Sequence, residues 1–193
     1  MLPTPLRVRI AIWAWLIAAL LVGHYGLLQR LPLPAVQGVL FAVTALLLVL
    51  YFKAAGLRAW IDALDPRSLV LLHVTRFVGI YFLILYQRGE LPYAFAVPGG
   101  WGDIGVASLA LLVCFLPLPP AARHRALTIW NTLGFADIMM VVVTAGRLGL
   151  QGEPLMRNLT VLPLSLLPTF LVPLIIATHI ILYLRLRRAV PTA

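Results

Sequence analysis

Charged residues are scarce in this chain of 193 residues: only 11% are Asp, Glu, Lys or Arg, whereas 62% are apolar. Globular domains are about a quarter charged and half apolar, so this composition excludes an aqueous enzyme and a soluble nucleic-acid-binding domain. Acidic side chains are rarer than basic ones, six Asp and Glu against 15 Lys and Arg, for a formal net charge of +9. The basic residues lie between hydrophobic runs. We therefore interpret the excess charge as a signal for membrane orientation and expect no nucleic-acid partner.

Cysteine is almost absent as well. The single copy, Cys114, lies in an apolar run, which excludes an intrachain disulfide and a metal site built on cysteines. The sequence also lacks the motifs of catalytic nucleophiles, phosphate-cradling loops and zinc hydrolases. Whether the protein is an enzyme therefore stays open.

Long hydrophobic runs dominate what is present. A helix of about 20 apolar residues crosses the ~30 Å hydrocarbon core of a bilayer. Six stretches approach this length: 8–28, 35–53, 68–87, 102–118, 126–147 and 159–184. The sequence predicts an all-α polytopic membrane protein that forms a single transmembrane domain over residues 1–193, with the lipid bilayer as its surroundings.

The connection between the second and third stretches has a helical pattern of its own. Apolar residues recur at the i, i+3, i+4 and i+7 positions of one helix face: Leu57, Trp60, Ile61 and Leu64. This pattern predicts a short amphipathic helix over residues 54–65 that lies in the membrane interface.

The stretch 91–103 is too apolar for a solvated loop and too rich in Pro and Gly for a helix. We predict that it forms an extracytoplasmic loop, containing Pro98 and Trp101, which re-enters the membrane or rests its rings among the headgroups. Asp103 would then cap the helix that follows. The alternative role for Asp103 is a functional carboxylate at an extracytoplasmic opening.

The basic residues predict the orientation. Six spans place both termini on one side, and that side carries ten basic residues: Arg7, Arg9, Lys53, Arg58, Arg67, Arg123, Arg125, Arg185, Arg187 and Arg188. The opposite side carries four, Arg30, Arg88, Arg147 and Arg157. Since positive residues concentrate on the cytoplasmic side, both termini are predicted to be cytoplasmic.

Five polar residues lie inside predicted spans, where ionisable side chains are candidates for function. His73, Asn131 and His179 are each six residues from an arginine at the cytoplasmic edge, which places them ~9 Å into the bilayer at 1.5 Å per residue. Arg76 and Asp137 would lie deeper, at ~13 and ~18 Å. The third, fifth and sixth spans could therefore supply one buried cluster.

Three interpretations of this cluster are open. In the first, Arg76 and Asp137 form a structural ion pair while the histidines and Asn131 hydrogen-bond between helices. In the second, His73 and His179 ligate haem b, bacteriochlorophyll or a metal ion, with Arg76 and Asn131 completing the site. In the third, Arg76 and Asp137 form part of a transport path for an ion or solute, or of a proton path. The protein could also be an accessory or structural subunit of a larger membrane complex, or a homo-oligomer.

Several of these residues carry a resemblance to a family. The runs 73–79, 89–92 and 95–103 resemble one half of a widespread family of uncharacterised bacterial membrane proteins. Its second half is matched by Trp130-Asn131, Gly134, Asp137, Leu162-Pro163, Pro173 and His179. The resemblance covers about residues 67–185. It implies a bacterial inner-membrane location and no particular chemistry.

Overall fold

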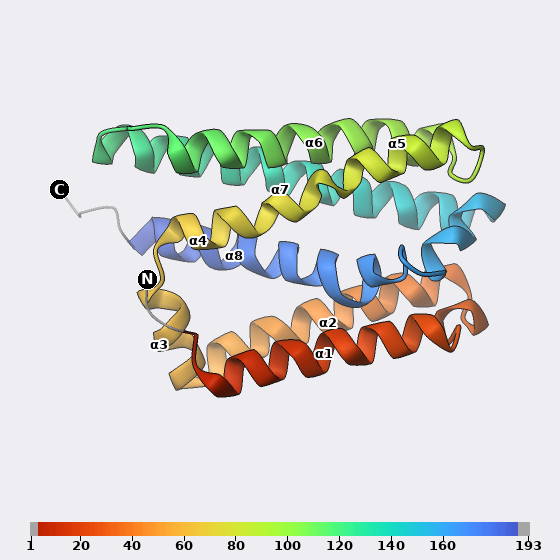
Figure 1. Cartoon of the computed structure of the whole chain (residues 1–193), viewed down its shortest axis with the longest axis horizontal. Helices are drawn as coiled ribbons and strands as arrows, with labels where there is room; N and C mark the ends of the chain where they lie inside the picture. Colours follow the sequence, from red (N-terminus) through yellow and green to blue (C-terminus); the bar gives the residue numbers. More distant parts are fainter. Residues whose placement is uncertain (1–3, 189–193) are drawn as a thin grey trace. The chain divides into compact units, whose positions relative to one another are not determined.

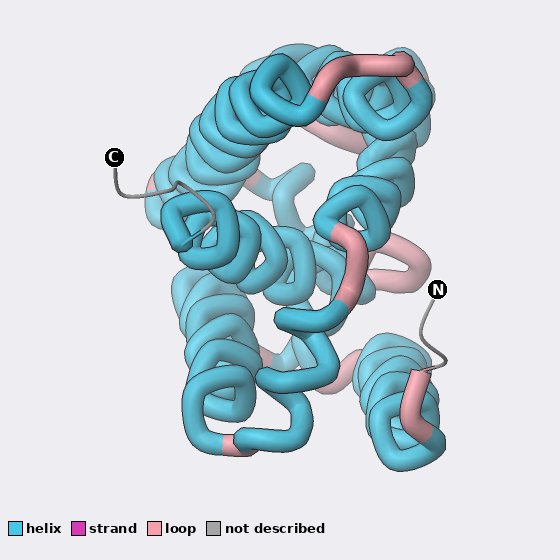
Figure 2. Tube along the Cα trace, turned by 90° about the vertical axis from the view of Figure 1, so that its left-hand side faces the viewer, coloured by secondary structure: helices cyan, strands magenta, loops and turns pink. Residues whose placement is uncertain are grey.

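Figure 1 shows a computed structural model of the chain, which describes residues 4–188. Within these residues the structure consists of helices and short connections, without a strand (Figure 2). Six helical segments are long and apolar enough to cross a membrane: Leu6–His24, Leu33–Lys53, Pro66–Gln87, Tyr93–Phe115, Pro120–Leu150 and Leu167–Arg188. The prediction of an all-α chain with six helices of spanning length is confirmed.

The contacts within the chain divide it into two compact units. Unit 1 combines Met1–Leu64 with Ala145–Ala177, and unit 2 combines Asp65–Thr144 with Thr178–Ala193. Helices α7 (Pro120–Leu150) and α8 (Val172–Arg188) contribute residues to both units.

Unit 1 contains α1 (Leu6–His24), η1 (Leu28–Arg30), α2 (Leu33–Lys53), α3 (Ala55–Ala63), η3 (Pro154–Thr160) and η4 (Leu167–Leu171). The helix α3 corresponds to the predicted short amphipathic helix. Its Asp62 accepts a hydrogen bond of 2.8 Å from the Tyr51 hydroxyl and lies 3.6 Å from Arg58 Nε. These contacts tie α3 to the end of α2. Its location in a membrane interface stays a prediction.

The proline-rich segment that precedes α8 leaves the α-helical pattern. Residues Leu167–Leu171 form a π-helix, a conformation that widens one turn and frees a carbonyl. The indole N–H of Trp15 donates to the carbonyl oxygen of Thr169 at 2.9 Å, and the Thr169 hydroxyl donates to the Ser165 carbonyl at 2.7 Å. Side chains thus supply polar partners where the prolines interrupt the backbone ladder.

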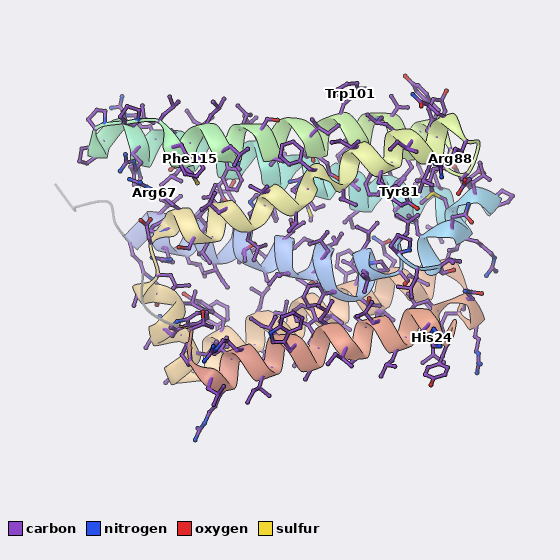
Figure 3. The ribbon with its side chains drawn as sticks, in the orientation of Figure 1. His24, Arg67, Tyr81, Arg88, Trp101 and Phe115 are labelled. Atoms are coloured by element: carbon purple, nitrogen blue, oxygen red, sulfur yellow. The ribbon has the colours of Figure 1, made fainter. Side chains whose placement is uncertain are left out.

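Unit 2 contains α4 (Pro66–Leu72), η2 (His73–Val78), α5 (Gly79–Gln87), α6 (Tyr93–Phe115) and the unit 2 parts of α7 and α8. Asp65 starts α4 by accepting from the Arg67 backbone N–H at 2.9 Å. Arg67 and Phe115 lie at one end of the unit and Arg88 at the other (Figure 3). The segment α4–η2–α5 therefore runs the length of the unit beside α6 (Figure 1).

The predicted loop over residues 91–103 is wrong for most of its length. Residues 93–103 form the first half of α6, so Pro98 lies inside a helix, and Trp101 projects outward from it with 63% of its surface exposed (Figure 3). The fourth spanning segment begins nine residues earlier than its predicted start at residue 102. Asp103 is therefore an interior residue of α6 and does not cap its start.

The glycines of this stretch serve close packing and not a turn. A methyl group added to Gly100 would lie 2.8 Å from the Gly79 carbonyl oxygen, and one added to Gly99 would lie 3.3 Å from Val141 Cγ2. Small residues let helix backbones approach each other, which is the usual way apolar helices pack without help from water. This is the physical reason that a glycine-rich run is helical here.

Buried apolar side chains form a cluster in unit 2. Its members come from α4, α6, α7 and α8: Val70, Val106, Ala110, Cys114, Leu127, Trp130, Leu182 and Leu186. The Trp130 indole N–H satisfies its hydrogen-bonding need inside this cluster by donating to the Val106 carbonyl at 3.0 Å.

The contact between Gly79 and Gly100 predicts that Gly100→Ala destabilises the protein. The added methyl would meet the Gly79 carbonyl and the Leu83 side chain within 3.0 Å, and overpacking of this kind costs about 1–3 kcal/mol. Gly105→Ala, in the same helix, is the matched control because nothing lies within 4 Å of its added methyl. Thermal unfolding in detergent should show a lower midpoint for Gly100→Ala only. Equal midpoints for the two variants would contradict the close packing.

Candidate functional site

Arg76 is the largest fully buried side chain of the described residues, with none of its surface exposed. It lies in η2, a 3₁₀ segment in which residues three apart lie directly above one another. His73 and Arg76 are three apart, so this local geometry places both side chains on one line. The Thr75 hydroxyl donates to the Leu72 carbonyl at 2.7 Å, where η2 begins.

The guanidinium of Arg76 makes three hydrogen bonds from three different nitrogens. Nε donates to Asp103 Oδ1 at 2.6 Å, Nη1 donates to the Gly134 carbonyl oxygen at 2.9 Å, and Nη2 donates to Asp137 Oδ2. The two carboxylate side chains are 5% and 14% exposed, respectively. We call Arg76, Asp103 and Asp137 the charge triad. It joins η2, α6 and α7.

Glycines make room for the triad. A methyl group added to Gly102 would collide with Asp137 Oδ1, and one added to Gly134 would lie 2.7 Å from His179 Cε1. Both glycines are in helices, so their role here is close approach and not backbone freedom. Without side chains at these two positions, the Asp137 carboxylate rests against α6 and the His179 ring rests against α7.

The charges in the triad do not balance. One guanidinium, which is charged at every relevant pH, pairs with two carboxyl groups, so the fully ionised triad carries a net charge of −1. Away from water an uncompensated charge is very costly, and a proton or a cation neutralises it. The triad therefore differs from a simple structural ion pair, whose charges cancel.

The second part of the site is the pair of His73 and His179. Their ring centroids are 4.2 Å apart and the ring planes are inclined by 55°. His73 Nε2 is 3.1 Å from the Thr178 hydroxyl oxygen, and His179 Nδ1 is 2.8 Å from Asn131 Oδ1. Asn131 also donates from Nδ2 to the His179 carbonyl at 3.1 Å, which ties α7 to α8.

Aromatic rings surround the two histidines. The Trp130 ring is perpendicular to that of His73, with centroids 4.9 Å apart, and the Phe135 ring is 5.9 Å from that of His179. Because His73 is 1% and His179 0% exposed, both imidazoles lie in an apolar, enclosed environment.

The predicted haem or bacteriochlorophyll does not fit this arrangement. Ligation by both histidines would place the macrocycle between the two rings. Centroids 4.2 Å apart are closer than the roughly 4.5–7 Å typical of rings in direct contact, so nothing fits between them. Their complete burial also leaves no open surface for a macrocycle beside either ring.

The histidine pair offers too few ligands for a metal ion. Zinc sites use about three or four protein ligands. The described residues contain no group of three or more His, Cys, Asp or Glu side chains that could hold a metal ion. His73 and His179 alone do not complete such a site.

The structure brings together all five residues of the predicted cluster: His73, Arg76, Asn131, Asp137 and His179. It adds Asp103, which pairs with Arg76 and which the sequence analysis assigned to a loop. Pro98 and Trp101, assigned to the same loop, lie elsewhere on α6 and make no contact with the triad that the structure records. The signal for Asp103 was available, because it is the only charged residue in the 23-residue run Tyr93–Phe115.

A family model described as a domain of unknown function (DUF8737) matches residues 33–187. The chain belongs to this family. The match includes every residue of the charge triad and of the histidine pair. No curated protein and no solved structure matches the chain.

The triad predicts that Arg76→Leu is strongly destabilising. Removal of the guanidinium leaves the buried Asp103 and the partly buried Asp137 without their partner, which costs about 3–5 kcal/mol. Arg58→Leu is the control, because the Arg58–Asp62 pair is 41% and 31% exposed and such pairs contribute about 0–1 kcal/mol. Unfolding in detergent measures both losses. Similar losses for the two variants would show that the triad does not stabilise the protein.

Proposed function

We propose that the protein is inserted in the cytoplasmic membrane of a bacterium with six spans and both termini in the cytoplasm. Six helices of spanning length support insertion. The distribution of basic residues, ten against four, supports the orientation. The many large apolar side chains on the outer surface of the helices, such as Trp13, Trp101 and Phe115, suit a lipid environment.

This topology predicts the behaviour of reporter fusions. A reporter that is active only in the cytoplasm should be active when fused after Ala193, and inactive when inserted at Gly89 in the connection between α5 and α6. Gly89 is suited to the insertion because it lies between helices, so that neither helix is interrupted. The opposite pattern of activity would reverse the orientation.

We further propose that the protein moves protons across the membrane through the carboxyl groups of the charge triad. The observation that carries this proposal is the net charge of −1 on a triad among apolar helices, in which Arg76 and Asp103 are buried and Asp137 is partly buried. A proton bound to one carboxyl group removes this excess charge. Buried ionisable residues of this kind form proton relays in pumps and transporters.

The geometry of Arg76 supports an exchange between the two carboxyl groups. Its Nη1 is anchored to the Gly134 carbonyl, which holds the guanidinium between Asp103 and Asp137. When a proton occupies one carboxyl group, Arg76 pairs with the other carboxylate, so the charged partner alternates while the guanidinium stays in place. Asp137, with its larger exposed fraction, is the carboxyl group that exchanges protons first.

Proton flux into liposomes tests this proposal. The purified protein is reconstituted with a pH-sensitive dye inside the vesicles, and a potassium diffusion potential, negative inside, drives protons inward. Internal acidification should be faster than in protein-free vesicles. Asp103→Asn and Asp137→Asn should each reduce it to the protein-free rate, because an amide keeps the shape of the side chain but carries no exchangeable acid proton.

Glu90→Gln is the control for these two substitutions. Glu90 is an exposed residue between α5 and α6, so its replacement should leave the flux unchanged. An unmodified protein that acidifies the vesicles no faster than the protein-free background would overturn the proposed function. So would full flux in both triad variants.

A further inference from the structure

Each ring of the histidine pair has one nitrogen without a partner. Nδ1 of His73 and Nε2 of His179 are buried and make no hydrogen bond, while the other nitrogen of each ring contacts Thr178 or Asn131. A buried polar atom without a partner costs about 1–3 kcal/mol. Two of them on neighbouring rings call for a functional explanation.

The hydrogen bonds of Asn131 determine which nitrogen of His179 carries its proton. The Asn131 amide nitrogen donates to the His179 carbonyl, so its carbonyl oxygen faces the ring and can only accept. His179 Nδ1 must therefore be the N–H donor. In the neutral ring, Nε2 is then an unused lone pair that can bind a proton.

His73 has the matching arrangement. Its Nε2 lies 3.1 Å from the Thr178 hydroxyl oxygen, which can accept from an N–H at that position. With its proton on Nε2, the neutral His73 ring has its lone pair on Nδ1. The two rings then offer two lone pairs to a proton, inside a wall formed by Trp130 and Phe135.

Gly134 connects the histidine pair to the charge triad. Its carbonyl accepts from Arg76 Nη1, and its missing side chain brings it against His179, with an added methyl 3.2 Å from Nε2. Asp137 is three residues further along α7 and so lies on the same face, one turn away. The unused lone pair of His179 therefore lies beside the helix stripe that carries a carboxyl group of the triad.

We propose that His73 and His179 form a relay that delivers protons to Asp137. The proposal rests on the proposed function of the triad.

A hydronium ion transfers a proton to the His73 Nδ1 lone pair and becomes water. Because His73 Nδ1 and His179 Nε2 make no hydrogen bond to each other, His73 releases the proton through one water molecule to His179 Nε2. His179 Nε2 passes it through a second water molecule to the Asp137 carboxylate, which becomes a carboxylic acid. Both rings return to their neutral form, because the N–H groups facing Thr178 and Asn131 are not used. The charged side chains of the neighbouring elements are Arg76 on η2, Asp103 on α6 and Asp137 on α7.

The relay is tested with the same vesicles and with variants that replace each ring by an amide of similar reach. His73→Asn and His179→Gln place an amide near the nitrogen in question but cannot carry a proton onward. Each should lower the proton flux by about a hundredfold or more, the lower end of the contribution of a positioned acid–base group. His24→Gln is the matched control, because His24 is an exposed histidine of unit 1. Added imidazole should restore flux to His179→Ala, which a purely structural role of the ring does not predict.

The outcomes separate this inference from the proposed function. Reduced flux in both variants, with restoration by imidazole, supports the relay. Unchanged flux in His73→Asn and His179→Gln, while Asp137→Asn still abolishes it, overturns the relay and leaves the proposed function intact. Absence of flux in the unmodified protein overturns both. If one variant does not fold, the other decides, because the relay requires both rings.

Discussion

The buried guanidinium of Arg76 is the constraint around which unit 2 is built. Arginine keeps its charge in proteins, so its complete burial requires acceptors for its N–H groups in a fixed, planar arrangement. Two carboxyl groups and one backbone carbonyl supply them from α6 and α7. The absence of side chains at Gly102 and Gly134 follows from this constraint, because the acceptors reach Arg76 only if the helices approach closely.

Much of the site was predictable from the sequence, because height along an apolar helix follows from residue number. A helix rises by a constant 1.5 Å per residue, and arginines at the edges of the apolar stretches give a common reference. Counting from Arg67, Arg125 and Arg185 placed His73, Asn131 and His179 at one level, and the structure has these three side chains together in unit 2. Depth says nothing about direction around the helix, so the partners Thr178 and Gly134 were not identifiable.

Asp103 was assigned to a loop, and so was not grouped with Arg76, because Pro and Gly occur both in loops and at close helix contacts. In water, Gly99, Gly100 and Gly102 beside Pro98 indicate a loop, since glycine weakens an isolated helix. Between apolar helices the same residues allow close contact, and the gain in packing outweighs their low helix propensity. The π-helix at Leu167–Leu171 illustrates a related limit: the prolines predict an irregular helix, but the partner that completes it, Trp15, is more than 150 residues away in sequence.

The 3₁₀ conformation of η2 sets the length of the segment α4–η2–α5, and the hydrogen bonds of Arg76 help to hold that conformation. A 3₁₀ helix rises about 2.0 Å per residue against 1.5 Å in an α-helix, so the six residues of η2 are about 3 Å longer than the same residues would be as an α-helix. The number of residues per turn also differs, 3.0 against 3.6, so conversion of η2 would rotate α5 relative to α4 by about a third of a turn. The bonds from Arg76 to α6 and α7 oppose that screw motion. The length of α4–η2–α5 and the rotation of α5 relative to α4 are therefore coupled to the hydrogen bonds of Arg76.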